Sequence, residues 1–510
     1  MTPASLKWRL FLTCWIIYVI HFATDFVREH YLVVSIAEDA TFRLDPYADL
    51  HVDLFWNPDS APVKGAHHGA NPGVSLLAAI PYGILRPAVD RVNDRILAGR
   101  KLKPDTSVSY NDPRWRRVEF YKKVRERGLD IKFGLVGAIT QSLFQAPMSA
   151  LSVVVVFSLL ATLGLATRTA LGLALVYGFG TPVFLRTGYL NQNLGLGIFA
   201  FFAFILLWNP GNRSTLSFRT RYVTAGILAG LCLLYDYSGA LIVAALGVYA
   251  LVRRKDEVRS WGFALTHSLW YAIGVLPGVL ALWWYQWASF GSFWRPPQHW
   301  MPPVEWVDIG YQGVGGFGAD LFRMLLFDTR FGLFVTTPIF LLALAAPFAV
   351  RKGRSFLPSR ETWFCLGMTL AFVLFFSTVQ YTRLQWVTGI RYLAAVFPFV
   401  FLAAAAVLVR LPRILAWGFV VLSVVINWSL AMVRSQGTVA ENVQRVVLEG
   451  PQLPWLTVLG KTATQYAPWL QGVSPVFIML VTGAVIALIW VVKEPWKPIM
   501  GSGYTEGRAA

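Results

Sequence analysis

The chain has 510 residues, of which 56% are hydrophobic and only 14% charged, and its formal net charge is +18. Soluble domains carry about 25% charged residues, so this composition excludes an ordinary soluble protein. Excess basic charge on a soluble chain would suggest nucleic-acid binding. Here the basic residues lie between long apolar runs, so membrane topology explains them and we expect no nucleic-acid partner.

The N-terminal segment and the cysteines limit the class further. Lys7 and Arg9 precede an apolar run as in a signal peptide, but no small-residue cleavage site follows, which predicts an uncleaved anchor. The three cysteines all lie inside apolar runs, and the absence of a CxxC spacing indicates neither a disulfide framework nor a zinc site.

Apolar runs that could cross a bilayer recur along the chain. A run of about 20 residues spans as a helix, and the alternation of a membrane β-barrel is not seen. The first predicted span covers Trp8 to Ala23, and later spans are centred near Val155, Ala174, Ala200, Ile227, Ala244, Val275, Phe340, Leu370, Ala404, Val421 and Val485. The sequence predicts an all-α polytopic membrane protein, one integral membrane domain over residues 1–510.

The distribution of Lys and Arg predicts the orientation. With the N-terminus in the cytoplasm and one crossing per span, every predicted cytoplasmic loop is basic, as the positive-inside rule requires, and the C-terminus is also cytoplasmic. Three large pieces then face outward: residues 25–132, 289–330 and 434–471. We expect a protein with this much irregular chain on the outer side to act there.

Two short apolar segments, one within the first outer piece and one directly after it, allow alternatives. Gly73–Leu85 and Phe133–Gln145 are at or below the usual span length, and the segment between them is basic. Either both cross, or both lie at the outer interface as helices. The interfacial alternative is preferred because basic helices with aromatic residues favour that position.

The stretch TDFVREHY, which follows the first span, carries the most informative polar residues. If the helix continues, Asp25, Arg28 and Glu29 share one face. A carboxylate beside lipid and a cation can have a pKa suited to a general base. Alternatively, Asp25 only ends the helix and pairs with Arg28.

The segment KGAHHGANPG, from Lys64 to Gly73, predicts a turn, because Gly and Pro favour turns. Lys64, His67 and His68 could meet a phosphate. His30, His51, His67 and His68 could instead bind a metal with nearby carboxylates, although no HExxH or comparable spacing supports this. Histidines solvated in a loop are the third alternative.

Arginines recur at predicted outer boundaries. Arg330 lies in FDTRFGLFVTTP, and Arg383 and Arg391 lie in YTRLQWVTGIRY. Arginine holds phosphate in a bidentate fashion, but interfacial arginine also binds lipid head groups. Asp236 lies in a short outer turn between two spans, either as a turn residue or as a functional carboxylate.

These features together resemble the GT-C glycosyltransferases, which include protein O-mannosyltransferases and the aminoarabinose transferases of lipid A. The order is similar: a first span, an acidic residue at its outer end, a large outer loop with interfacial helices, then further spans. Three stretches resemble segments of uncharacterised bacterial members: HHGANPGVSLLAAIPY (His67–Tyr82), FDTRFGLFVTTP (Phe327–Pro338) and QWVTGIRYLAAVFP (Gln385–Pro398). Asp328, Thr329 and Phe331 depart from the second of these patterns.

The resemblance implies a GT-C-like fold with about 11 to 13 transmembrane helices. It implies sugar transfer from a polyprenyl-phosphate donor, in a bacterial inner or plasma membrane, with the active site extracytoplasmic. The carboxylate after the first span, Asp25, would be the base, and Glu29 is the nearest candidate for a second acid. Donor and membrane lipid would be partners, and the acceptor could be protein, lipid or polysaccharide. The residues expected to bind substrate are Arg28, His30, Lys64, His67, His68, Asn71, Arg330, Arg383 and Arg391.

No cofactor is expected, although a divalent metal stays an alternative. The main rival function is a transporter or flippase of a lipid-linked sugar, but transporters of this size commonly show inverted repeats and charged midplane residues, which are not visible here. A ligase that moves a whole glycan and a scaffold with a degenerate site are further rivals. Fold likeness by itself does not decide among them.

Overall fold

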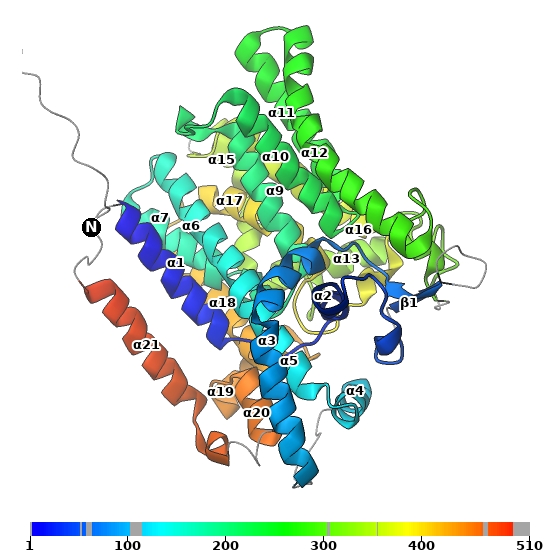
Figure 1. Cartoon of the computed structure of the whole chain (residues 1–510). Helices are drawn as coiled ribbons and strands as arrows, with labels where there is room; N and C mark the ends of the chain where they lie inside the picture. The colour runs from blue at the N-terminus through cyan, green and yellow to red at the C-terminus, as the bar shows by residue number, and fades with distance from the viewer. Residues whose placement is uncertain are drawn as a thin grey trace, which may run out of the picture.

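A computed structural model describes residues 3–51, 54–57, 64–102, 115–302, 306–353, 355–462 and 468–492. Over these residues the chain is predominantly helical, and the described strands form one two-stranded sheet. The helices pack side by side, with the first helix and the last described helix at one edge (Figure 1). The predicted all-α class is confirmed.

Every predicted span centre falls in a helical segment. The first span is α1 (Pro3–Ile20), and the centre near Phe340 lies in a 3₁₀ helix, η5 (Pro338–Ala345). The other centres lie in α6 (Ala146–Thr162), α7 (Thr167–Phe179), α9 (Gln192–Trp208), α10 (Phe218–Tyr235), α11 (Gly239–Val258), α12 (Trp261–Phe290), α16 (Ser359–Phe376), α17 (Phe397–Leu408), α18 (Arg413–Val433) and α21 (Pro475–Val491).

Length and composition identify the strongest membrane-spanning candidates. Among the described residues three helices are long and apolar enough to cross a membrane: Asp130–Thr162, Trp261–Phe290 and Arg413–Val433. Four shorter apolar helices accompany them. These helices support an integral membrane protein, and the total number of crossings stays a prediction.

The separation of Phe133–Gln145 from the span near Val155 is wrong. α5 (Asp130–Thr140), a π-turn η2 (Gln141–Gln145) and α6 form one continuous helix of 33 residues. Pro147 explains the π-turn, because proline lacks an N–H and its ring pushes against the carbonyl one turn earlier. The helix widens there instead of ending.

The first outer segment contains more regular structure than the sequence predicts. It comprises α2 (Arg28–Asp39), η1 (Asp45–Tyr47), β1 (Leu54–Asn57), β2 (Gly65–His68), α3 (Gly73–Leu102) and α4 (Trp115–Glu126), before α5. The turn predicted from Lys64 to Gly73 is wrong over its first half, because β2 pairs antiparallel with β1 in the register Leu54↔His68. A strand partner outside the segment overrides the local preference for a turn.

Helix α3 extends past the predicted apolar segment Gly73–Leu85 to Leu102. Its polar second half is held by ion pairs: Arg86 with Asp90 one turn on, at 3.4 Å, and Arg100 with Asp130 of α5, at 2.6 Å. Such ion pairs stabilise a polar helical segment, which a search for apolar runs does not detect. Whether α3 crosses the bilayer or lies at its interface stays a prediction.

Glycines bring α10 and α12 into close contact. Each helix carries a small-xxx-small pair, Gly226 with Gly230 and Gly274 with Gly278. A Cβ added at Gly274 would lie 2.2 Å from the carbonyl oxygen of Val223, and one added at Gly278 would lie 2.3 Å from that of Gly230. Close approach through glycines is a common way for membrane helices to associate.

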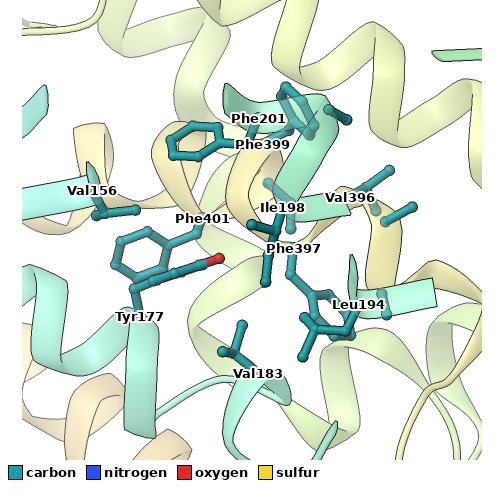
Figure 2. Packing of buried hydrophobic residues seen from close by; sticks show 14 of the residues in the cluster. Val156, Tyr177, Val183, Leu194, Ile198, Phe201, Val396, Phe397, Phe399 and Phe401 are labelled. Carbon is teal, nitrogen blue, oxygen red and sulfur yellow. The ribbon is translucent and has the colours of Figure 1, made fainter. Parts of the chain in front are cut away.

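An aromatic core lies where α7, α9 and α17 meet (Figure 2). Tyr177 and Phe401 have ring centroids 5.3 Å apart, and Phe201 meets Phe399 edge to face at 5.9 Å. Such offset and edge-on pairs are favourable beyond the area they bury. These contacts hold α7, α9 and α17 together.

Shorter elements connect the helices at both ends. They are α8 (Val183–Thr187), η3 (Pro210–Asn212), η4 (Pro297–Trp300), α13 (Ala319–Phe327), α14 (Leu333–Thr336), α15 (Ala346–Arg351), η6 (Gln380–Arg383), η7 (Tyr392–Val396), α19 (Val439–Glu449), α20 (Pro454–Thr462) and η8 (Pro468–Gly472).

The charged residues at the two ends of the bundle differ in kind. The basic residues predicted to be cytoplasmic lie at one end of their helices: Arg219 begins α10, Arg254 and Lys255 lie in the last turns of α11, and Arg413 begins α18. The opposite ends of these helices carry Asp236 and Arg434. The candidate site lies at that second end.

Candidate functional site

The segment after α1 does not continue as a helix. The α1 helix ends at Ile20, and residues 22–27 have no regular structure before α2 begins at Arg28. The His21 ring lies 2.8 Å from the Ile17 carbonyl oxygen, and the Ala23 N–H donates to the Gly188 carbonyl oxygen. The prediction that Asp25, Arg28 and Glu29 share one helical face is therefore wrong.

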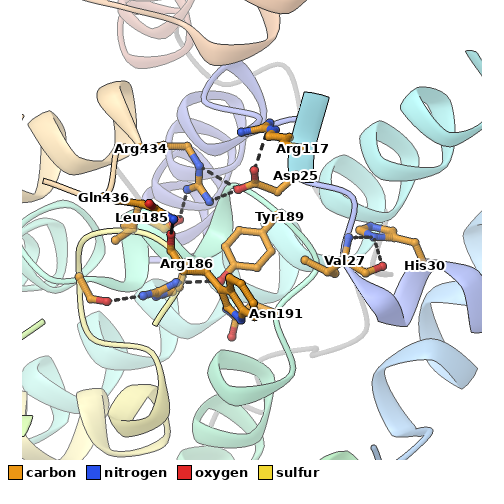
Figure 3. Close-up of polar contacts among 12 residues, drawn as sticks. Asp25, Val27, His30, Arg117, Leu185, Arg186, Tyr189, Asn191, Arg434 and Gln436 are labelled. Atoms are coloured by element: carbon orange, nitrogen blue, oxygen red, sulfur yellow. Dashed lines mark hydrogen bonds and ion pairs between the residues drawn. The ribbon is translucent and has the colours of Figure 1, made fainter. Parts of the chain in front are cut away.

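Asp25 lies between two guanidinium groups from distant segments (Figure 3). Arg434 donates from Nε and Nη2 to one carboxylate oxygen, at 3.1 and 2.5 Å. Arg117 of α4 lies 3.3 Å from the other oxygen. The alternative in which Asp25 pairs with Arg28 is wrong, because Arg28 pairs with Glu29.

Electrostatics keep the Asp25 carboxylate ionised. Burial alone would raise its pKa, but Arg434 and Arg117 outweigh burial and hold the pKa below its ordinary value. The Asp25 side chain keeps 21% of its exposure, whereas that of Arg434 keeps 5%. The carboxylate is accessible, and the arginine behind it is fixed.

A second, buried arginine lies beside this pair. Arg186 of α8 is fully buried and donates to the carbonyl oxygen of Ile390 at 3.1 Å and to the Tyr189 hydroxyl at 2.8 Å. The Arg434 guanidinium lies over the Tyr189 ring, 5.0 Å from its centroid. Arg186 also lowers the pKa of Asp25, so the surroundings of the carboxylate carry an excess of positive charge.

Glu29, the other predicted catalytic acid, is buried in the first turn of α2. Its carboxylate pairs with Arg28 at 3.2 Å, and the Nε2 atom of His68 lies 4.0 Å away. Burial alone would raise the pKa of Glu29, but the Arg28 guanidinium helps hold it below the ordinary value. The structure therefore groups Glu29, Arg28 and His68, three of the predicted site residues.

The histidines are not solvated loop residues. His67 and His68 of β2 are fully buried, and His30 is 1% exposed. The His30 Nδ1 atom accepts from the Val27 N–H at 3.0 Å, and its Nε2 lies 3.2 Å from the Thr140 hydroxyl, which itself donates to a carbonyl. This ring links α2 to α5. Burial lowers the pKa of all three histidines to about 4, so they are neutral at neutral pH.

The metal alternative requires several ligands to converge. Within the described parts of the chain, no group of three or more His, Cys, Asp or Glu side chains lies close enough to hold a metal ion. The grouping of His30, His51, His67 and His68 around one ion is therefore not found among these residues.

The three arginines predicted at outer boundaries differ in how they are paired. Arg330 is half exposed and lies 3.8 Å from Asp328, and Arg383 is exposed and paired with Asp320. Arg391 is partly buried, lies 4.4 Å from the centroid of the Tyr392 ring and donates to its hydroxyl. Over the described residues, Arg391 has no carboxylate partner.

Backbone hydrogen bonds join three segments that the sequence predicts to face outward. The Gly389 N–H donates to the Arg330 carbonyl oxygen, the Thr388 N–H to that of Ser435, and the Val439 N–H to that of Thr329, at 2.8 to 2.9 Å. The motif around Arg330, the motif around Arg391 and the segment after α18 therefore meet, as their placement on one face predicts.

The remaining predicted residues lie around the end of α10. Asn71 is 1% exposed and donates to the Leu233 carbonyl oxygen at 2.6 Å. Asp236 accepts from Ser238 and Gln192 in the turn that leads to α11. Burial raises the pKa of Asp236 above its ordinary value. Lys64 is exposed directly before β2.

Sequence reasoning missed the residues that hold Asp25. In the sequence, Arg434 is only the first residue of a predicted outer piece, Arg117 lies in a basic segment, and no motif marks Arg186. Arginines in predicted outer segments depart from the positive-inside rule, and this departure is the signal that singles out Arg186 and Arg434.

Comparisons with known proteins give one result. No protein-family model matches the chain, and no curated protein matches it. Among solved structures, the crystal structure of ArnT from Cupriavidus metallidurans bound to undecaprenyl phosphate is similar, with 14% sequence identity and a TM-score of 0.47. The match covers 95% of this chain and 74% of that one.

Proposed function

We propose that the protein is a membrane glycosyltransferase of the GT-C type that moves a sugar from a polyprenyl-phosphate donor to an acceptor hydroxyl. One observation carries the proposal: at one end of a bundle of apolar helices, the accessible carboxylate of Asp25 lies in the same polar region as arginines that a phosphate could engage. A base and a cation for the leaving group, both within reach of lipid, are what this chemistry needs.

The reaction follows from these groups. The acceptor oxygen attacks the anomeric carbon of the sugar, and a new glycosidic bond forms. The bond between that carbon and the phosphate oxygen breaks, and polyprenyl phosphate leaves with the bonding electrons. The acceptor proton passes to Asp25. Because the phosphate gains negative charge as it leaves, cations placed in advance stabilise the transition state.

The arginines around Asp25 have a positioning role in this proposal. Arg434 and Arg117 hold the carboxylate in one orientation and keep it ionised and ready to accept a proton. They also make it a weak base, so proton transfer would accompany the attack rather than precede it. Because two guanidinium groups hold it, the Asp25 carboxylate is ionised when the acceptor binds.

Arg391 is the first candidate for the donor phosphate. It has no carboxylate partner in the described chain, and its Nε atom is buried without a hydrogen-bond partner. A buried guanidinium donor without a partner is costly, and a phosphate would satisfy it. Arg330 and Arg383 already have carboxylate partners, so in this proposal they attract the donor rather than hold it.

The proposal includes the membrane setting. The end with Asp25 faces the extracytoplasmic side of a bacterial inner or plasma membrane, and both termini are cytoplasmic, because the basic residues lie at the opposite helix ends. The donor's prenyl chain lies in the bilayer. The acceptor is a hydroxyl of protein, lipid or polysaccharide, and the mechanism uses no metal.

Release of polyprenyl phosphate tests the proposal. Purified protein would be supplied with undecaprenyl-phosphate mannose, glucose and aminoarabinose, each radiolabelled in the sugar, and with a membrane extract as acceptor. We expect release from at least one donor, with the label appearing in the acceptor. The same donors placed in one leaflet of proteoliposomes test the rival transporter. Movement of the donor lipid between leaflets without release of polyprenyl phosphate would contradict the proposal and favour the transporter.

A further inference from the structure

Three polar side chains lie around the end of α10. Asn71 lies in the segment between β2 and α3, Gln192 begins α9, and Asp236 follows α10. Asn71 donates to the Leu233 carbonyl oxygen near the end of α10, and the Gln192 amide donates to the Asp236 carboxylate at 3.1 Å. The transferase proposal gives this group no role.

The hydrogen bonds fix which atoms stay available. Because the amide nitrogens of Asn71 and Gln192 donate to oxygens, the amide oxygens Oδ1 and Oε1 must be on the other side. Both oxygens are buried and have no hydrogen-bond partner among the described residues. A buried acceptor without a partner is costly, so two such acceptors at the end of α10 favour a ligand that supplies hydrogen-bond donors.

The Asp236 carboxylate adds acceptor capacity. One oxygen accepts from the Ser238 N–H at 2.8 Å and from its hydroxyl at 2.7 Å, and the other accepts from Gln192. A carboxylate has about four acceptor positions, so the second oxygen can still accept. In the described chain Asp236 has no ion pair, and it is partly exposed.

The surrounding charges decide what kind of donor fits. The guanidinium groups of Arg28 and Arg391 both act on the Asp236 carboxylate. Two positive charges that act on one carboxylate, without an ion pair to it among the described residues, disfavour a metal ion or a free ammonium group at the same place. Neutral hydroxyl groups, which donate without bringing charge, satisfy the acceptors at no electrostatic cost.

From this arrangement we infer that Asn71, Gln192 and Asp236 form the subsite for the donor's sugar ring, binding its hydroxyl groups as acceptors. The inference rests on the proposed transferase function and deepens it. Arg391, which acts on Asp236 and is the candidate for the donor phosphate, ties the subsite to the donor rather than to the acceptor. A sugar phosphate then places its ring at the acceptors and its phosphate at the guanidinium.

The test separates the sugar's contribution from the lipid's. Detergent-solubilised wild type and variants would be titrated with undecaprenyl phosphate and with undecaprenyl-phosphate mannose and glucose, in competition with labelled undecaprenyl phosphate. The variants are Gln192→Met and Asp236→Asn. Gln286→Met is the matched control. Gln286 is also buried and donates to the Tyr237 hydroxyl in the same turn, but it is not one of the three proposed sugar-binding residues.

We expect wild type to prefer a sugar-bearing lipid over the bare lipid phosphate. Each subsite variant should reduce that preference by about tenfold, with binding of undecaprenyl phosphate unchanged within about twofold, and the control should keep the preference. If both subsite variants prefer the sugar-bearing lipid over undecaprenyl phosphate as strongly as wild type does, the inference is overturned. That holds even if the variants raise the KM for the acceptor in a turnover assay. Failure of the transferase proposal looks different, because wild type would then release no polyprenyl phosphate from any donor.

Discussion

Arg434, the residue that follows α18, donates two hydrogen bonds to the carboxylate of Asp25, which lies 409 positions earlier in the chain. Arg434 has a left-handed backbone, with φ 51°, and its Nη1 also donates to the Leu185 carbonyl oxygen. The arginine thus joins the segment after α1 to the end of α18. This contact organises the candidate site.

Removing either partner of this pair should destabilise the protein. Arg434→Gln leaves Arg117 as the remaining ion-pair partner of Asp25 among the described residues, and Asp25→Asn leaves a nearly buried guanidinium without its anion. We expect each change to lower the unfolding temperature in detergent. The double variant should lose less than the sum of the single losses, with a coupling energy of about 1–3 kcal/mol. Additive losses in this double-mutant cycle would show that the two side chains do not interact.

Arg391 should matter to the donor more than the exposed arginines do. Arg391→Lys keeps the charge but loses the planar fork, and Arg391→Met loses both. We expect the KM for the polyprenyl-phosphate sugar to rise by about tenfold in the lysine variant and further in the methionine variant. Arg383→Met serves as the control, because Arg383 is exposed and pairs with Asp320. An equal rise in the KM for the donor in Arg391→Met and Arg383→Met would contradict the assignment of Arg391 to the donor phosphate.

The crossing of α10 and α12 should depend on its glycines. Gly274→Ala places a methyl group 2.2 Å from a backbone oxygen, so the two helices must move apart. Forced overpacking of this kind costs about 1–3 kcal/mol. Gly262→Ala, in the same helix with no atom within 4 Å of the added carbon, is the matched control and should leave the unfolding temperature unchanged or slightly raised. Equal unfolding temperatures in the two variants would contradict the close crossing.

Acid should destabilise the folded protein through its buried histidines. Burial lowers the pKa of His30 and His68 from 6.5 to about 4 in the folded state. Between these pH values the two histidines are protonated in the unfolded chain and neutral in the folded chain. The free energy of unfolding therefore rises with pH across this window. The contribution of the two neutral histidines to the free energy of unfolding is fully present above pH 6.5. It is lost progressively as the pH falls toward 4.

Thermal unfolding in detergent at several pH values measures this loss. The variant His68→Gln should flatten the dependence, because glutamine can still donate to the Ala70 carbonyl oxygen, as the ring nitrogen can at 3.0 Å, without titrating. The depressed pKa of Asp25 acts in the same direction at lower pH, since the pair with Arg434 is lost only as the carboxylate protonates. A dependence that is identical in wild type and variant would exclude His68 as a contributor.

The helical segments could be predicted because length and apolar composition determine them locally. Every predicted centre lies in a helix or a 3₁₀ turn, and the all-α class is confirmed. Errors arose where a distant partner decides the local structure. Gly65–His68 became a strand because β1 pairs with it, and the second half of α3 is held by Asp130.

The candidate site could be predicted only in part for the same reason. Asp25, Glu29 and Arg391 stood out through their positions beside apolar runs. The partners of Asp25 could not be foreseen, because a contact across 409 positions follows from how the helices pack and not from local pattern. The burial of His67 and His68 was equally hidden, since a Gly- and Pro-rich segment normally indicates an exposed turn.

Turnover by Asp25→Asn is the most direct test of the account. Asparagine keeps an oxygen that Arg434 can donate to but cannot take up a proton, so undecaprenyl phosphate binding by the variant serves as the control for folding. The assay follows release of polyprenyl phosphate from the donor that wild type uses best. We predict unchanged lipid binding and a fall in turnover of at least about a hundredfold, in line with loss of a general base. Turnover near the wild-type rate would contradict the assignment of Asp25 as the base.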